Sequence, residues 1–199
     1  LNACEVLHPR VGQQISNMKS QLTELEARAR LPQIELSMSG WREDTAAPDD
    51  RSGALVFRHL DDLSGADEDR LFGLVDSLEL AAYGQAGGPD TVAPLRASHA
   101  VTMGYDLPDF GLRLQFGAND FTQVNMAVNR RMVAQALAWL RPEEFDRVLD
   151  LFCGIGNFTL PIARTAGQVF GVEGAAGAVA RARDNAKLNA IDNCAFEVA

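Results

Sequence analysis

Cysteine is scarce in this 199-residue chain, which carries only Cys4, Cys153 and Cys194. Three scattered cysteines are too few for a disulfide framework or a self-contained zinc site, and they suit a reducing compartment. Long apolar runs are also missing, because charged residues interrupt every hydrophobic stretch. We therefore expect neither a signal peptide nor a membrane span, and a cytoplasmic location.

Basic charge is in short supply, with 18 Lys and Arg against 27 Asp and Glu and a formal net charge of −9. This balance argues at first against a nucleic-acid partner, whose phosphates attract Lys and Arg. The acidic excess is local, however. Residues 41–110 carry 5 basic and 14 acidic residues, whereas residues 1–40 carry 4 of each and residues 111–199 carry 9 of each. An RNA-facing surface on either flank is compatible with this distribution.

Residues 148–161 (VLDLFCGIGNFTLP) hold the clearest pattern for a binding site. The apolar first half predicts a strand, and the glycine turn before a helical pattern predicts a tight loop that opens a helix. Gly154 and Gly156 lack a Cβ, so the backbone there can turn sharply and approach a ligand. The first N–H groups of the helix would face the same ligand. The stretch predicts a nucleotide-cofactor site.

Three positions favour S-adenosylmethionine over a dinucleotide. Thr159 stands where the dinucleotide fingerprint has its third glycine. Asp150 lies at the carboxyl end of the predicted strand, where a carboxylate can hold a cationic amino-acid moiety. Glu173 ends the next strand and can accept hydrogen bonds from both ribose hydroxyls. The alternative is that both acids are ordinary strand-end carboxylates and that the glycines only turn the chain.

The remaining periodicity predicts two parts. Residues 1–117 mix amphipathic helices with short alternating strands, which indicates an α+β module with an antiparallel sheet and a mobile loop at 42–52. Residues 118–199 alternate strands and helices, which indicates a parallel sheet with crossover helices. We expect helices over 11–29, 66–78, 125–140, 157–164 and 175–189, and strands over 34–38, 54–58, 80–85, 101–105, 112–116, 148–152, 169–173 and from 194 onward.

These residues also resemble a known family. The resemblance is carried by FTQVN at 121–125, by Asn129 and Met132, by the run at 148–161 and by GVEG at 171–174. They resemble the bacterial RNA uracil-5-methyltransferases, and among these the iron–sulfur-containing enzymes that methylate 23S ribosomal RNA. The likeness implies a truncated α/β, Rossmann-like S-adenosylmethionine-dependent methyltransferase domain over 118–199, preceded by an α+β central, RNA-facing domain over 1–117.

The resemblance implies roles for single residues. It puts Gln123 beside S-adenosylmethionine, Phe152 and Asn157 in the loop around the cofactor, and Glu173 on the ribose. It makes Cys4 the last ligand of a [4Fe–4S] cluster whose other three ligands precede Leu1. The alternatives are that Gln123 is a buried amide capping the next helix, that Phe152 is core packing, and that Cys4 is a free loop cysteine.

The family's reaction is covalent. A cysteine thiolate adds to C6 of uracil, C5 takes the methyl group, and a carboxylate removes the C5 proton. The likeness places nucleophile and base downstream, so we expect this chain to be an inactive internal fragment. Cys153 and Cys194 are expected to be structural. The alternatives are a noncatalytic module that docks RNA or a protein, a transfer RNA methyltransferase, and an NAD-dependent oxidoreductase.

The strand at residue 148 is normally central in such a sheet. Within this excerpt we expect it to form an edge, and an apolar strand edge favours pairing with a second copy. The sequence therefore also predicts self-association of the isolated chain.

Overall fold

The structure is a computed structural model that describes residues 2–40 and 53–199, so the predicted loop at 42–52 lies outside it. The chain divides into two compact units. Of the described residues, the first unit holds 2–39 and 53–103, and the second holds Gly40 and 104–199. Every helix among them is too short or too polar to cross a bilayer.

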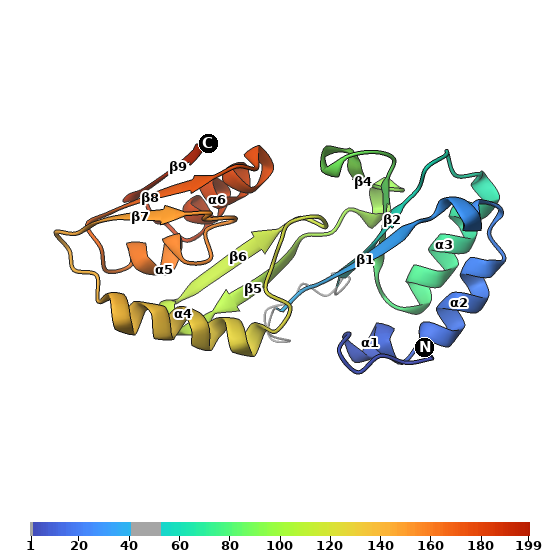
Figure 1. The fold of residues 1–199 in the computed structure, drawn as a ribbon, viewed down its shortest axis with the longest axis horizontal. Coiled ribbons are helices and arrows are strands. Elements are labelled where there is room, and N and C mark those ends of the chain that lie inside the picture. The colour runs from blue at the N-terminus through green and yellow to red at the C-terminus, as the bar shows by residue number, and fades with distance from the viewer. Residues whose placement is uncertain (1, 41–52) are drawn as a thin grey trace. The chain divides into compact units, whose positions relative to one another are not determined.

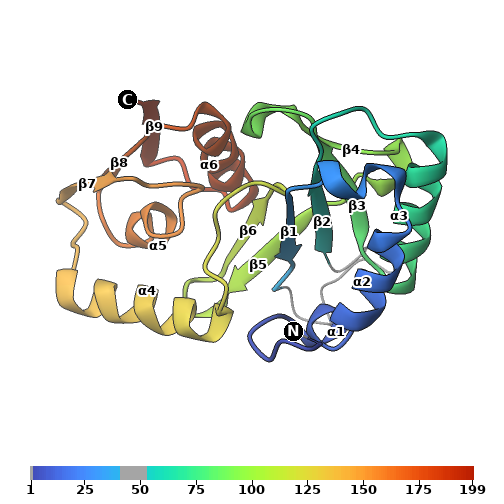
Figure 2. The same ribbon diagram turned by 45° about the vertical axis from the view of Figure 1, so that its right-hand side comes forward.

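The first unit is built on a four-stranded sheet in the order β1-β2-β3-β4 (Figure 1). Its strands are β1 (Gln33–Met38), β2 (Gly53–Arg58), β3 (Ala81–Gln85) and β4 (Val92–Pro94). Its helices are α1 (Pro9–Gly12), α2 (Ile15–Thr23) and α3 (Gly65–Ser77), with 3-10 helices at Glu26–Arg30, Pro89–Thr91 and Ala97–His99. α2 and α3 contact each other, and α3 contacts β3 (Figure 2).

α3 confirms the predicted helix over 66–78, and its start has a clear cause. The Ser64 hydroxyl accepts a hydrogen bond from the Asp67 N–H at 3.2 Å, and acids fill the first turn, where they complement the helix dipole. The apolar side of α3 joins a core in which the largest fully buried side chains are Phe57, Leu25, Leu55, Leu71, Leu74, Leu80 and Val75.

The helix predicted over 11–29 is wrong in its extent. The structure replaces it with α1, α2 and a 3-10 turn. Asp67, only 1% exposed, accepts hydrogen bonds from the N–H groups of Glu26 at 2.8 Å and Ala27 at 2.9 Å. A distant carboxylate thus satisfies backbone donors that a continuous helix would bond internally.

The predicted antiparallel sheet is mixed. β1 and β2 pair antiparallel as expected, with Ile34 opposite Phe57. β2 and β3 are parallel, because α3 carries the chain back across the sheet before β3 begins. β4, which the sequence did not predict, pairs antiparallel with β3 at the sheet edge, where Pro94 is tolerated.

The second unit holds a hairpin and a parallel sheet. The hairpin is β5 (Met103–Leu107) and β6 (Leu112–Phe116), joined by a 3-10 turn at Pro108–Phe110 and by Gly111 at φ +60°. The parallel strands are β7 (Arg147–Leu151), β8 (Gln168–Glu173) and β9 (Cys194–Val198), in that order. The helices are α4 (Met126–Leu140), α5 (Thr159–Ala163) and α6 (Ala176–Leu188). The predicted strand and helix alternation is confirmed.

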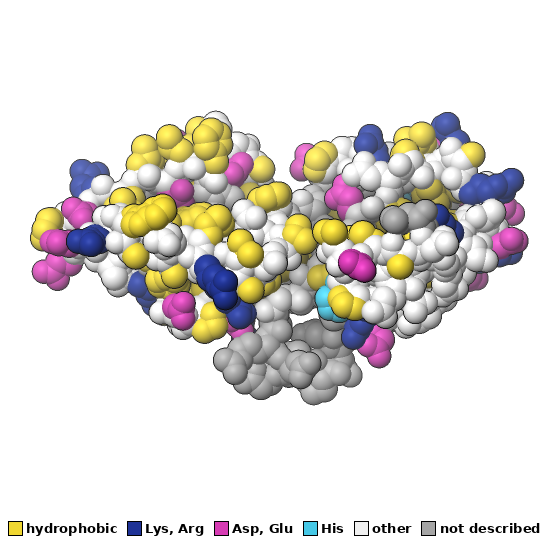
Figure 3. All heavy atoms as spheres, turned by 60° about the horizontal axis from the view of Figure 1, so that its bottom comes forward, with side chains coloured by type: hydrophobic (Ala, Val, Ile, Leu, Met, Phe, Trp, Pro, Cys, Tyr) yellow, Lys and Arg dark blue, Asp and Glu magenta, His cyan; other side chains and the backbone are white. Residues whose placement is uncertain are grey.

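One face of this parallel sheet is covered and the other is open. Val169, Gly171 and Phe196 are buried on the face against which α5 and α6 pack. The neighbouring positions Leu149 and Leu151 are 59% and 58% exposed on the opposite face. β7 is an edge strand among the described residues, as predicted. Figure 3 shows further apolar side chains among charged ones on the face of this unit that carries α4.

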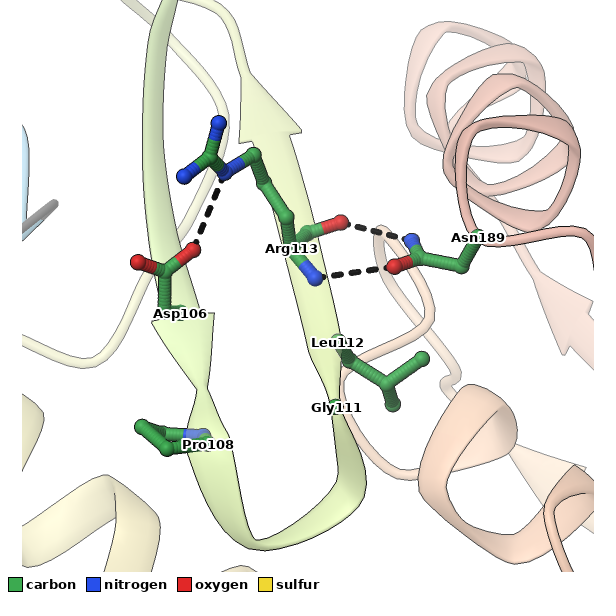
Figure 4. A pocket seen from close by; sticks show the side chains of 6 residues that line it. All are labelled: Asp106, Pro108, Gly111, Leu112, Arg113 and Asn189. Atoms are coloured by element: carbon green, nitrogen blue, oxygen red, sulfur yellow. Dashed lines mark hydrogen bonds and ion pairs between the residues drawn. The ribbon is translucent and has the colours of Figure 1, made fainter. Parts of the chain in front are cut away.

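The division between the units differs from the predicted boundary after residue 117. The hairpin belongs to the second unit because α6 holds β6 by side chains. Asn185 accepts from the Gln115 N–H at 2.7 Å and donates to its carbonyl at 3.0 Å. Asn189 does the same to Arg113, at 2.8 and 2.6 Å (Figure 4). Each amide thus pairs with β6 as a neighbouring strand would.

We predict that Asp67→Ala destabilises the first unit by about 3 kcal/mol, since it leaves the backbone N–H groups of Glu26 and Ala27 without their charged acceptor. Urea unfolding measures this. The matched control is Asp69→Asn, which removes only the exposed ion pair with Arg96 at 2.6 Å and should change stability by less than about 1 kcal/mol. Equal effects of the two substitutions would contradict the role of Asp67.

Candidate functional site

The loop after β7 has an unusual backbone. Three of its residues have positive φ, namely Phe152 at +61°, Gly154 at +53° and Gly156 at +95°. A Cβ placed on Gly154 would meet nothing within 4 Å, so one side of the loop faces open space. Both glycines take the left-handed backbone that their missing Cβ permits, but only Gly154 lies beside open space, because Gly156 is buried against Leu160.

Phe152 is the most informative residue of this loop. It has the left-handed backbone that bulky residues avoid, and its side chain is 88% exposed. The alternative that Phe152 packs in the core is wrong. An exposed aromatic ring held in a strained conformation gains nothing for the fold, and such strain is typical of binding sites.

Asp150 and Thr159 form a pair beneath the loop. The Thr159 hydroxyl, fully buried, donates to the Asp150 carboxylate at 2.5 Å. Burial raises the pKa of Asp150, and the hydrogen bond from Thr159 opposes that rise. Thr159, which stands at the position of the third glycine of a dinucleotide loop, thus donates a hydrogen bond to Asp150, the acid at the end of β7.

Glu173, at the end of β8, joins two backbone segments. One carboxylate oxygen accepts from the Gly154 N–H at 3.1 Å and the other from the Ala175 N–H at 3.0 Å. The acid therefore lies against the glycine loop, as the register of the two strands requires, with Asp150 opposite Gly171. Its remaining acceptor capacity is available to a ligand hydroxyl.

Asn157 points into a network inside the unit. Its Oδ1 accepts from the Tyr105 hydroxyl at 2.8 Å and from the Asn129 amide at 2.9 Å, and its own amide donates back to Asn129 at 3.0 Å. Asn129 and Tyr105 are 1% and 2% exposed. Asn157 is therefore a residue of this loop that directs most of its hydrogen-bonding capacity at the protein.

Gln123 precedes α4 and is exposed. The alternative that it is a buried helix cap is wrong, because Asn125 caps α4 by accepting from the Val128 N–H at 3.0 Å. The segment before it is anchored by Asp120, whose carboxylate accepts from the Gly117 N–H at 2.6 Å and from Arg181 at 3.2 Å. The backbone before Gln123 is thus held in place, and the side-chain amide of Gln123 is exposed.

Known proteins resemble this chain along its whole length. A family described as tRNA (Uracil-5-)-methyltransferase matches residues 100–198. A 23S rRNA (uracil(1939)-C(5))-methyltransferase RlmD from Hahella chejuensis is 46% identical over 200 residues, covering 100% of this chain and 43% of that protein. The enzyme of the same name from Methylococcus capsulatus is 47% identical, covering 98% of this chain and 42% of that protein.

The chain belongs to the RNA uracil-5-methyltransferase family. It spans less than half the length of these relatives. The crystal structure of the Pyrococcus abyssi tRNA (uracil-54, C5)-methyltransferase in complex with S-adenosyl-L-homocysteine aligns with a TM-score of 0.65 at 17% identity, over 100% of this chain and 49% of that one. The α/β methyltransferase fold predicted from the sequence is confirmed.

The two cysteines of the second unit, Cys153 and Cys194, are poor nucleophiles. Burial, and then the charges of Asp150 and Glu173, raise the pKa of Cys153 to about 11. Burial, and then Asp192, raise the pKa of Cys194 to about 11. Both thiols stay protonated at neutral pH, which agrees with the structural roles expected from the sequence.

Cys4 lies in the first unit and is partly buried. Its N–H donates to the Gly12 carbonyl at 2.9 Å. The described residues contain no group of three His, Cys, Asp or Glu side chains that could hold a metal ion. Since a [4Fe–4S] cluster needs four thiolates, the described residues alone do not fit one.

A pocket of about 270 Å³ lies between the hairpin and the end of α6 (Figure 4), and no residue of the glycine loop lines it. Its residues are Asp106, Pro108, Gly111, Leu112, Arg113 and Asn189. The Asn189 side chain is hydrogen-bonded to the β6 backbone, and the Arg113 side chain forms an ion pair with Asp106 at 3.1 Å. The pocket therefore belongs to the packing interface between the hairpin and α6.

Sequence reasoning missed three residues that contact the loop region. Tyr105 and Asn185 were not singled out, and Asn129 was noted only for its likeness to the family. The available signal in the sequence was a polar residue at a position where a helix buries its side chain. Asn129 and Asn185 each lie at a buried position of a helix, where an unpaired amide is costly and a partner must therefore exist.

We predict that Asp150→Asn raises stability at pH 7. The folded-state pKa of Asp150 lies above its ordinary 3.8, so folding favours the protonated form. That contribution is complete below about pH 3.8 and is lost as the pH rises through the folded pKa. An asparagine removes the buried charge and can still accept from Thr159. Denaturant unfolding at pH 7 and pH 4.5 should show a gain that shrinks at the lower pH.

The partner substitution Thr159→Val serves as the opposite control. It removes the donor to Asp150 and should lower stability at pH 7 by about 2 kcal/mol. A variant Asp150→Asn that is less stable than wild type at pH 7 would show that the carboxylate is not penalised by burial.

Proposed function

We propose that this chain is part of an S-adenosylmethionine-dependent enzyme that forms 5-methyluridine in RNA, with 23S ribosomal RNA as the substrate. The observation that carries the proposal is Phe152, an exposed aromatic ring in a left-handed turn at the carboxyl end of a parallel strand. Ligands of open α/β sheets bind at this end of the strands. The names of the relatives supply the RNA target, and a bacterial ribosomal RNA substrate would be met in the cytoplasm.

The cofactor would be held by groups that surround the open side of the loop. Glu173 would accept from the ribose hydroxyls, Asp150 would face the cationic amino-acid end, and Gln123 offers both donor and acceptor. Phe152 provides apolar surface, and Gly154 and Gly156 keep the backbone close. When bound, S-adenosylmethionine supplies an electrophilic methyl group. The Thr159 and Asp150 pair disfavours the alternative of a dinucleotide, because it fills the place of the third glycine.

The thiolate that attacks uracil C6 would come from outside these 199 residues. Attack forms a C–S bond, C5 then takes the methyl group, a base removes the C5 proton, and the C–S bond breaks. Cys153 and Cys194 are unsuited to this because both thiols stay protonated at neutral pH. The relatives are more than twice as long as the part that this chain matches, which leaves room for the nucleophile and base.

The iron–sulfur cluster is likewise proposed only for the parent protein. Cys4 would supply one thiolate, and three more would have to come from outside the described residues.

The first test is binding of S-adenosylhomocysteine to the 199-residue chain by calorimetry, with NADH as the discriminating ligand. We expect S-adenosylhomocysteine to bind and NADH not to bind. Phe152→Ala should weaken binding at least about tenfold, because it removes the apolar surface at the strand end. Phe145→Ala, at another exposed phenylalanine, is the matched control and should change little. Binding of NADH without binding of S-adenosylhomocysteine would contradict the proposed methyltransferase function.

The second test is methyl transfer. We expect no incorporation of labelled methyl into an unmodified 23S transcript by this chain alone, whereas the complete parent protein should label it. The expected product of the parent is 5-methyluridine, identified by nucleoside mass spectrometry. Labelling by the 199-residue chain would show that the nucleophile lies within it.

The third test concerns self-association, which the open face of the parallel sheet favours. Leu149 and Leu151 lie on the edge strand β7, whose outer backbone groups can pair with a second copy. Light scattering should show a mass that rises with concentration. Leu149→Lys should suppress the rise, whereas Leu188→Lys, at a half-exposed leucine of α6, should not. A constant monomer mass for the wild-type chain would contradict the prediction.

A further inference from the structure

The glycine loop is held from behind by side chains that do not face its open side. From α4, Asn129 exchanges two hydrogen bonds with Asn157, at 2.9 and 3.0 Å. From β5, the Tyr105 hydroxyl donates to the same Asn157 oxygen at 2.8 Å. Asn157 lies in the loop, two residues before α5 begins at Thr159. Two elements thus converge on one amide.

Because these partners are buried, water cannot replace their hydrogen bonds to Asn157. Asn129 and Tyr105 are almost completely removed from water, so neither can exchange its partner for solvent. Burial also raises the pKa of Tyr105, so its hydroxyl remains a donor at any physiological pH. The Asn157 oxygen accepts two hydrogen bonds and is saturated. A ligand can therefore bind the Asn157 side chain only as an acceptor, through the second N–H of its amide.

A second support reaches the same loop from α6. Asn185, 1% exposed, donates to the Ile155 carbonyl at 3.1 Å. The same side chain accepts from the Gln115 N–H and donates to the Gln115 carbonyl of β6. One amide thus connects the hairpin, α6 and the middle of the glycine loop.

We propose that Tyr105, Asn129 and Asn185 are positioning residues that hold the loop at 153–158 in its ligand-ready shape before any ligand arrives. The β5–β6 hairpin is thereby part of the cofactor site's support. This inference deepens the proposed function and rests on it for the identity of the ligand. The physical gain is pre-organisation: a loop already ordered loses less conformational entropy on binding.

Hydrogen exchange of the ligand-free chain tests the support directly. We expect Tyr105→Phe and Asn129→Ala to speed exchange of loop amides such as Gly156 about fivefold, the change that loss of one typical hydrogen bond produces. Tyr83→Phe is the matched control, because the Tyr83 hydroxyl accepts from the Val101 N–H in the first unit and does not touch the loop.

Asn185→Ala is compared with Asn189→Ala. Both substitutions remove a side chain that pairs with the β6 backbone, but only Asn185 also contacts the loop. We expect Asn185→Ala to speed loop exchange and Asn189→Ala to affect only the hairpin. Equal loop exchange in these two variants would overturn the role of Asn185.

A double-mutant cycle separates positioning from general stability. Affinity for S-adenosylhomocysteine should fall about fivefold in Tyr105→Phe but stay unchanged in Tyr83→Phe, although each substitution removes a hydrogen bond and lowers the unfolding midpoint. In an Asn157→Ala background the same substitution should have no further effect, because its partner is gone. Fully additive effects would mean that Tyr105 does not act through Asn157.

The outcomes distinguish the two proposals. Loop exchange that is unchanged in Tyr105→Phe, Asn129→Ala and Asn185→Ala overturns the positioning role, whatever the ligand affinity. If the wild-type chain binds no S-adenosylhomocysteine but the variants loosen the loop, the positioning role stands and the cofactor assignment in this chain fails.

Discussion

The hydrogen bond from the Gly154 N–H to Glu173 is the contact on which the candidate site depends. It fixes the loop after β7 against the end of β8, and the parallel register of the two strands makes it possible. With the loop in this place, Phe152 is forced into a left-handed turn and its ring is exposed. A strained backbone persists only where its surroundings hold it, and here the surroundings are the carboxylate and the buried amides.

The hairpin β5–β6 has a different role from the one its sequence indicates. Its alternating pattern is typical of an independent antiparallel sheet, yet α6 covers β6 with two asparagine side chains that replace a neighbouring strand. Through Tyr105 on β5 and Asn185 on α6 the hairpin supports the glycine loop. The second unit is therefore a parallel sheet with an added support, and the predicted boundary after residue 117 separates parts that the structure joins.

Charge and apolar surface are distributed in keeping with the proposed reaction. The acidic excess lies in residues 41–110, while residues 111–199 are balanced. In the second unit one face of the sheet is closed by α5 and α6 and the other exposes leucines. Parallel sheets are normally covered on both faces, so this face is suited to contact with further protein. The site itself remains on the carboxyl ends of the strands, away from that face.

The sequence by itself determined the order of strands and helices after residue 112, the glycine loop, and the acids Asp150 and Glu173, because periodicity and turn chemistry are local. It could not determine the broken first helix, since Asp67 acts on residues 26 and 27 from 41 and 40 positions away. Nor could it reveal that Tyr105, Asn129 and Asn185 meet the loop, across as many as 52 positions. Hydrogen bonds between distant segments exist only once packing brings them together, and only the tertiary structure decided them.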